Sequence, residues 1–185
     1  ANRIGVFGMM EIMRLMKELN YSIEEVDAIF GTATGRPKSA VFRTADIVGL
    51  DTFIHVAQNC WDSLKDDERH DVFKIPDFLQ KMVSQGYLGQ KSGQGFYKKE
   101  KNEIFALDLD DMTYHSKKKV RFESIGALRG IGDAGEKIKS LVNANDRAAS
   151  FVWKVISSSL IYSANRVGKI ADTICDIDNA MKWGF

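Results

Sequence analysis

The stretch NRIGVFGMMEIMRLMKEL, residues 2–19, repeats apolar side chains at three- and four-residue steps, among them Val6, Met9, Met13 and Leu19. This spacing predicts an amphipathic helix whose inner face is rich in methionine. Plain core packing is the commoner role of such a face. An acyl-binding groove is the alternative, because methionine side chains adapt to ligands of variable shape.

The residues that follow predict a compact unit of five helices. Ser22-Ile23-Glu24-Glu25 has the spacing of a capping box and predicts the start of a second helix. Helically spaced apolar residues predict a third helix near 41–48, and Asp51 is placed to cap a fourth. Pro76 suits the first turn of a fifth helix, which Gly86 is placed to end.

One strand signal stands out from the helical pattern. Phe96-Tyr97 and Ile104-Phe105-Ala106-Leu107 flank the polar segment 98–103, which predicts one short β-hairpin or extended arm. The basic run Ser116-Lys117-Lys118-Lys119 follows. Such a run is most often a solvated linker, although it could also attract phosphate groups. We therefore predict a first domain over residues 1–99, a hairpin and basic linker over 100–120, and a second part over 121–185.

The second part repeats a feature of the first. Val26-Asp27-Ala28-Ile29-Phe30 aligns with Ile177-Asp178-Asn179-Ala180-Met181 at an offset of 151 residues, which predicts a truncated second helical copy. The segment 130–135 matches the GxGxxG pattern of dinucleotide-binding loops. No buried strand precedes it and no βαβ alternation follows, so we do not expect a dinucleotide there.

Composition excludes several other classes of function. The formal net charge is +1 and 44% of the residues are apolar, so we expect a globular protein that binds no nucleic acid. No apolar run approaches the roughly 20 residues of a membrane span, and no signal peptide is apparent, so we expect a cytoplasmic protein. Cysteine and histidine lack metal-ligand spacing, and the acids at 108–111 do not fit a calcium loop, so no metal is expected.

Two motifs carry a resemblance to a known family. Gly35-Arg36-Pro37 with Asp46-Ile47-Val48-Gly49-Leu50-Asp51-Thr52, and then the segment GYLGQKSGQGFY at 86–97, strongly resemble the C-terminal domain of 3-hydroxyacyl-CoA dehydrogenases. The resemblance covers residues 1–99 closely and 145–185 more weakly. It implies a mostly α fold, a helical bundle of that C-terminal type followed by the second copy. Duplicated domains of this kind are similar to those of multifunctional fatty-acid oxidation proteins.

The resemblance also implies an activity and its participants. Members transfer hydride between NAD and the C3 position of a 3-hydroxyacyl-CoA, using a His–Glu pair in a preceding NAD-binding domain. We expect that domain to lie upstream of this chain, which we interpret as an excised fragment that binds no cofactor and is inactive alone. The partners implied are the acyl-CoA substrate, the upstream NAD-binding domain, an enoyl-CoA hydratase fused on the same chain, and a second copy in a homo-oligomer.

Motif matching assigns site residues in the same way. The family has an asparagine at the start of the first helix that contacts the substrate oxygen, and Asn2 matches it. The alternative for Asn2 is a simple helix N-cap. Arg36, Pro37, Lys38 and Ser39 match a segment that borders the substrate, although Arg43 stands where the family usually has an acid.

Two functions from other classes stay open on the sequence alone. One is a non-catalytic helical module for dimerisation or scaffolding, which the departure at Arg43 favours. The other is a relative acting on a different carbonyl compound, because related dehydrogenases share this helical domain.

Overall fold

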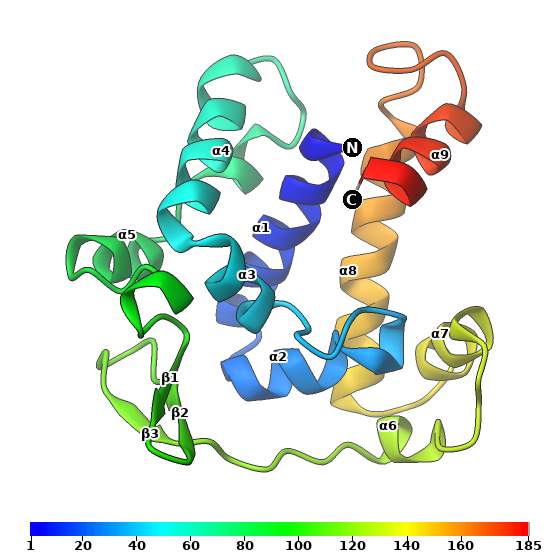
Figure 1. The fold of residues 1–185 in the computed structure, drawn as a ribbon. Coiled ribbons are helices and arrows are strands. Elements are labelled where there is room, and N and C mark those ends of the chain that lie inside the picture. The colour runs from blue at the N-terminus through cyan, green and yellow to red at the C-terminus, as the bar shows by residue number, and fades with distance from the viewer. Residues whose placement is uncertain (185) are drawn as a thin grey trace.

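The protein is mostly α-helical, as predicted (Figure 1). The computed structural model describes residues 1–184. The helices are α1 (Asn2–Glu18), α2 (Ile23–Ile29), α3 (Phe42–Val48), α4 (Leu50–Ser63), α5 (Asp77–Ser84), α6 (Glu123–Ala127), α7 (Ala134–Val142), α8 (Arg147–Ala164) and α9 (Ile174–Gly184), with 3₁₀ turns at Thr32–Thr34, His70–Phe73 and Gln90–Ser92. None of the helices in this part of the chain is both long and apolar enough to cross a bilayer.

The strands form a small antiparallel sheet in the order β1-β2-β3, with β1 at Tyr97–Glu100, β2 at Glu103–Leu107 and β3 at Tyr114–Ser116. The predicted hairpin is β1 and β2, which pair from Tyr97 opposite Ala106 to Glu100 opposite Glu103. Its turn places Lys101 in the left-handed region at φ +52°. Strand β3 was not predicted, because three residues are too few to show an alternating pattern.

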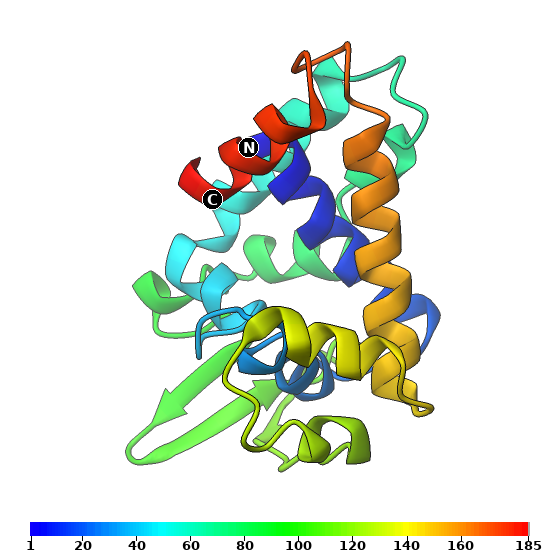
Figure 2. The same ribbon diagram turned by 90° about the vertical axis from the view of Figure 1, so that its right-hand side faces the viewer.

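The core joins the two ends of the sequence. Helices α1 and α8 lie side by side in both ribbon views (Figures 1 and 2). The ring of Phe7 on α1 stacks on Tyr162 of α8 with centroids 3.8 Å apart, and Tyr21 stacks on Phe151 at 4.5 Å. Because these are buried aromatic contacts, the second part of the chain stabilises the first directly.

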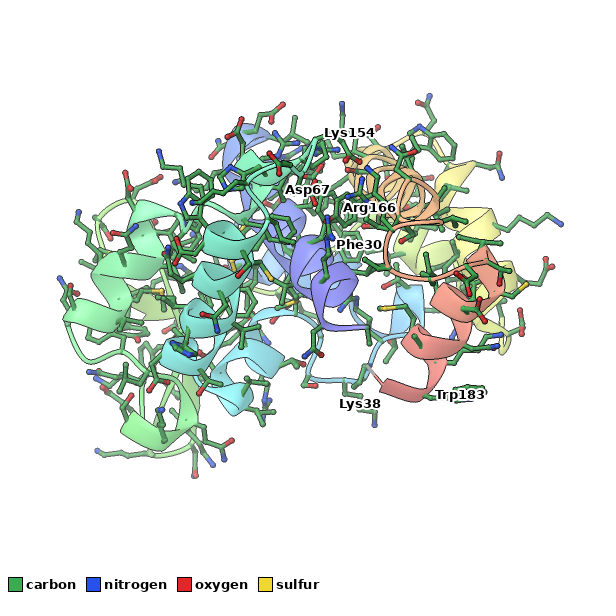
Figure 3. All side chains as sticks on the ribbon, turned by 90° about the horizontal axis from the view of Figure 1, so that it is seen from above. Phe30, Lys38, Asp67, Lys154, Arg166 and Trp183 are labelled. Carbon is green, nitrogen blue, oxygen red and sulfur yellow. The ribbon has the colours of Figure 1, made fainter. Side chains whose placement is uncertain are left out.

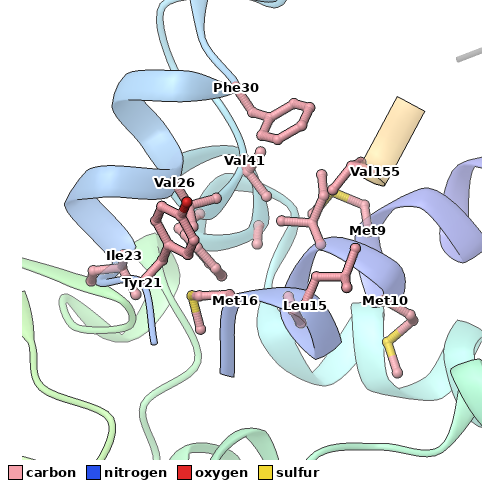
Figure 4. Close-up of a cluster of buried hydrophobic side chains, with 14 of the residues drawn as sticks. Met9, Met10, Leu15, Met16, Tyr21, Ile23, Val26, Phe30, Val41 and Val155 are labelled. Atoms are coloured by element: carbon pink, nitrogen blue, oxygen red, sulfur yellow. The ribbon is translucent and has the colours of Figure 1, made fainter. Parts of the chain in front are cut away.

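The methionine face of α1 belongs to this core, which favours the packing interpretation over an acyl groove. Met9, Met10 and Met16 are buried beside Val26 of α2 and Val155 of α8 (Figure 4). Met13, which completes the face, is fully buried as well.

Local signals in the sequence were mostly accurate. The capping box is present, with Ser22 Oγ accepting from Glu25 N at 3.2 Å and Ser22 N donating to the Glu25 carboxylate at 2.9 Å. The assignment of Asp51 as a cap is wrong. Helix α4 starts two residues earlier than such a cap requires, with Gly49 as its N-cap, and the Asp51 carboxylate pairs with Lys91 Nζ at 2.6 Å instead. The proposed boundaries at residues 99 and 120 stay a prediction.

A buried carboxylate connects the two motifs that carry the family resemblance. Asp46 on α3 accepts hydrogen bonds from Phe96 N at 2.8 Å and from Tyr97 N at 2.9 Å. The loop that supplies these groups approaches so closely that a Cβ added at Gly95 would lie 2.7 Å from Asp46 Cγ, and one at Gly89 would lie 2.7 Å from Asp46 Cα. Only glycine fits at these two positions without displacing backbone.

We therefore expect Gly95→Ala to destabilise the fold by about 2 kcal/mol or more, because an added methyl group overpacks a site that cannot give way. Gly132→Ala is the matched control, since a Cβ there would meet nothing within 4 Å. Urea unfolding followed by circular dichroism measures both. Equal stability of the two variants would contradict this account of the loop.

Candidate functional site

Asn2 lies at the first residue of α1 with its side chain exposed. The N-cap position is occupied by Ala1 and has no side-chain cap, so the alternative of Asn2 as the N-cap is wrong. The side-chain amide of Asn2 has no hydrogen-bond partner among the described residues. An exposed amide at a helix start, where backbone N–H groups also point outward, can hold a ligand oxygen.

The residue after Asn2 is fixed in place. Arg3 Nε donates to Tyr162 Oη at 2.8 Å, and Arg3 Nη2 pairs with Asp67 Oδ2. Tyr162 Oη in turn donates to the same Asp67 oxygen at 2.6 Å. The start of α1 is thereby attached to the loop after α4 and to α8.

A second arginine completes this cluster. Arg166, which is fully buried, lies 3.3 Å from Asp67 Oδ2 and also pairs with Glu68. Figure 3 shows Asp67 and Arg166 next to each other. Burial alone would raise the pKa of Asp67, but hydrogen bonds from Tyr162, Arg69 N and Arg3, with the charge of Arg166, hold it below its ordinary value. We call Arg3, Asp67, Tyr162 and Arg166 the anchor cluster.

A second feature is a cavity of about 770 Å³ between α2, α3, the hairpin and the segment 117–120. Seven cationic side chains line it, and we call it the basic cavity: Lys38, Arg43, Lys98, Lys99, Lys117, Lys118 and Lys119. Its volume falls in the range of about 300–1,000 Å³ that is usual for small-molecule sites. Lys117, Lys118 and Lys119, which the sequence favoured as a solvated linker, therefore form part of a cavity wall.

Only two of the four residues of the predicted substrate segment line the basic cavity. Lys38 and Ser39 line the basic cavity, whereas Arg36 and Pro37 do not. Arg36 lies over the ring of Phe30, 5.9 Å from its centroid, and burial lowers its pKa despite the nearby charge of Asp27. Pro37 is exposed.

Asn2 does not line the basic cavity. Its neighbours Ala1 and Ile4 border a separate, smaller pocket against α9, which Ile177 also lines. The predicted site residues therefore fall in two places, the start of α1 and the loop before α3.

Three acidic side chains line the basic cavity, and we call them the floor acids: Glu24 and Asp46 are buried and Asp27 is half-buried. Asp27 Oδ1 accepts from Val41 N at 3.0 Å and from Phe42 N at 2.8 Å, which secures the start of α3. Asp27 Oδ2 accepts from Tyr97 Oη at 2.9 Å. Burial raises the pKa of Asp27, and it raises the pKa of Asp46 to about 6 against the two backbone hydrogen bonds that this carboxylate accepts.

Sequence reasoning missed the anchor cluster and the floor acids as groups. Asp67 stands in a polar segment that gave no sign of burial, and its partners are 64 and 95 residues away in the chain. Asp46 carried a weak signal, since it is a charged residue between the apolar Ala45 and Ile47 in a predicted helix.

The glycine-rich segment 130–135 does not fit a dinucleotide. It follows α6 and runs into the first turn of α7, no strand directly precedes it, and the small sheet is antiparallel. At the start of α7, where a pyrophosphate would need free backbone N–H groups, the Asp133 carboxylate already accepts from Glu136 N at 2.9 Å. The segment therefore lacks the strand–turn–helix setting of an NAD-binding loop.

The fold and the two motifs together are those of a helical domain of the 3-hydroxyacyl-CoA dehydrogenase type. The family described as "3-hydroxyacyl-CoA dehydrogenase, C-terminal domain" matches residues 1–99. The chain belongs to this family.

Relatives extend the similarity beyond residue 99. A "Probable 3-hydroxyacyl-CoA dehydrogenase" of Bacillus subtilis (strain 168) is 46% identical over the whole chain, which spans 23% of that protein. A protein of the same description from Deinococcus radiodurans is 47% identical over 56% of the chain and 29% of the relative. A "Putative fatty acid oxidation complex trifunctional enzyme" of Rickettsia prowazekii is 24% identical over the whole chain and 25% of its own length. No solved structure matches.

The anchor cluster generates a stability prediction. Asp67→Asn leaves the buried guanidinium of Arg166 and the partly buried one of Arg3 without their shared carboxylate, so we expect a loss of about 3 kcal/mol in unfolding free energy at pH 7. Asp62→Asn is the control, because its exposed pair with Lys65 at 3.7 Å contributes at most about 1 kcal/mol.

The pH dependence follows from the lowered pKa of Asp67. A carboxylate with a lowered pKa contributes its stability above the ordinary value of 3.8, and the contribution is lost as the pH falls through the lowered value. Urea unfolding curves of wild type and Asp67→Asn should differ at pH 7 and converge in acid. A difference that persists unchanged in acid would refute the charge-based explanation.

Proposed function

We propose that this chain is the substrate-side module of an NAD-dependent 3-hydroxyacyl-CoA dehydrogenase of fatty-acid β-oxidation. In this proposal a separate upstream domain holds NAD and the His–Glu pair, so the chain does not turn over alone. The observation that carries the proposal is the family match over residues 1–99 together with the exposed Asn2 at the start of α1. The proposal includes the cytoplasmic location expected from the sequence.

Asn2 has a defined role in this proposal. When hydride leaves C3, the oxygen on that carbon changes from hydroxyl to carbonyl, and an amide N–H directed at it stabilises the change in charge. The value of such a donor depends on how firmly it is held. The anchor cluster supports this role, because Arg3 is held by a buried carboxylate and a buried phenol one residue from Asn2.

The basic cavity supports an acyl-CoA partner. Coenzyme A carries several phosphate groups, and the cavity gathers seven cationic side chains, with Lys38 and Ser39 of the predicted substrate segment on its wall. The name of the Rickettsia relative supports a place in fatty acid oxidation. The resemblance to multifunctional fatty-acid oxidation proteins adds an enoyl-CoA hydratase on the same parent chain to the proposal.

An association module is the second candidate, and a specific observation favours it. Apolar side chains remain exposed on the second part, including Leu160 at 64% and Ile161 at 61% on α8 and Trp183 at 82% on α9. Large exposed apolar residues mark surfaces that bind other proteins. The two candidates differ in whether the chain supports catalysis.

The test is oxidation of NADH by acetoacetyl-CoA. The chain is assayed alone and mixed with a separately expressed NAD-binding domain of a 3-hydroxyacyl-CoA dehydrogenase. We expect activity only in the mixture, and a fall of roughly 10²-fold or more in Asn2→Ala, because one oxyanion donor is lost. Asn59→Ala, an exposed amide on α4, is the control and should leave the rate unchanged.

Two results would count against the proposal. No activity in the mixture, with both proteins folded and shown to associate, would favour the association module. Activity that survives Asn2→Ala would remove Asn2 from the site while leaving the module's role in place.

A further inference from the structure

The cations of the basic cavity are mostly unpaired. Among the described residues, Lys98 has a carboxylate within ion-pair distance, that of Glu100 at 2.5 Å, whereas the other six have none within 4 Å. Three of those six are the consecutive Lys117, Lys118 and Lys119 on one wall. Gathered like charges destabilise one another, and a bound anion relieves that cost.

The same cavity also contains a buried carboxylate oxygen that lacks a hydrogen-bond donor. Glu24 is only 3% exposed and lines the cavity. Its Oε1 accepts from Lys118 N at 3.2 Å, whereas its Oε2 has no hydrogen-bond partner among the described residues. A buried carboxylate oxygen without a donor is costly, so this atom is a place for a donor from a ligand.

The other two floor acids are already satisfied. Asp27 accepts from two backbone groups and from Tyr97, and Asp46 accepts from the backbone of Phe96 and Tyr97. They therefore offer little to a ligand. The cavity therefore combines lysine side chains that can bind anionic groups with one buried acceptor, Glu24 Oε2, that can bind a neutral or cationic donor.

We propose that the basic cavity binds a phosphorylated nucleoside, with its phosphates on Lys117 and Lys119 and an amino group of its base on Glu24. The proposal rests on the proposed function, since the nucleotide end of coenzyme A carries phosphates and an exocyclic amine. It adds a position for that end, which is separate from Asn2. Lys117 Nζ lies 5.0 Å from the centroid of the ring of Tyr97, which also lines the cavity.

Calorimetric titration of the whole chain with adenosine 3′,5′-bisphosphate tests the proposal. We expect saturable binding that weakens about tenfold or more in the double variant Lys117→Gln/Lys119→Gln, because two charge-assisted contacts are lost. Lys154→Gln/Lys182→Gln removes the same charge from exposed positions on α8 and α9 and should leave the affinity unchanged. No binding, or equal weakening in both double variants, would overturn the proposal.

Glu24→Gln tests the nucleoside part, with inorganic pyrophosphate as the second probe and circular dichroism as the check on folding. We expect the variant to bind the bisphosphate several-fold more weakly and pyrophosphate no more weakly. Pyrophosphate binding as tight as that of the nucleotide in wild type would overturn the nucleoside assignment. Because the titration needs no NAD-binding domain, bisphosphate binding without catalysis in the mixture would refute the proposed function and not this site.

Discussion

The carboxylate of Asp46 is the constraint on which the arrangement of the cavity depends. It lies inside the loop 89–97, accepts two of its backbone N–H groups, and leaves no space for a Cβ at Gly89 or Gly95. The loop leads directly into β1, so the same contact sets where the hairpin leaves the helical bundle. It therefore places Lys98 and Lys99 opposite the loop before α3, and the wall of the basic cavity follows from it.

The anchor cluster fixes the position of the start of α1. Its members come from α1, the loop after α4, α8 and the residues just beyond α8. Because buried ion pairs demand particular geometry, they favour one packing of α8 on α1 over alternatives of similar apolar area. The stacked rings of Phe7 and Tyr162 supply the apolar part of the same contact. The second part of the chain thus supports the helix that carries Asn2.

Much of the fold could be predicted because its signals are local. The capping box at Ser22, the hairpin around residues 98–103 and the apolar spacing of α1 each depend on neighbours within a few residues. The site could be predicted only in part. Asn2 and Lys38 came from motif matching, whereas the pairing of Asp67 with Tyr162 spans 95 residues and leaves no periodic pattern. The lysines at 117–119 were visible as a charge run, but their position on a cavity wall depends on the path of the sheet.

The central claim is that the basic cavity of this domain receives part of the acyl-CoA. Amide hydrogen exchange, measured with and without coenzyme A, tests it most directly, since it needs neither catalysis nor a second domain. The account predicts slower exchange at residues 38–43 and 117–120 when coenzyme A is present, and no change at the loop 65–70. Protection confined to α8 and α9, or no protection at all, would contradict it.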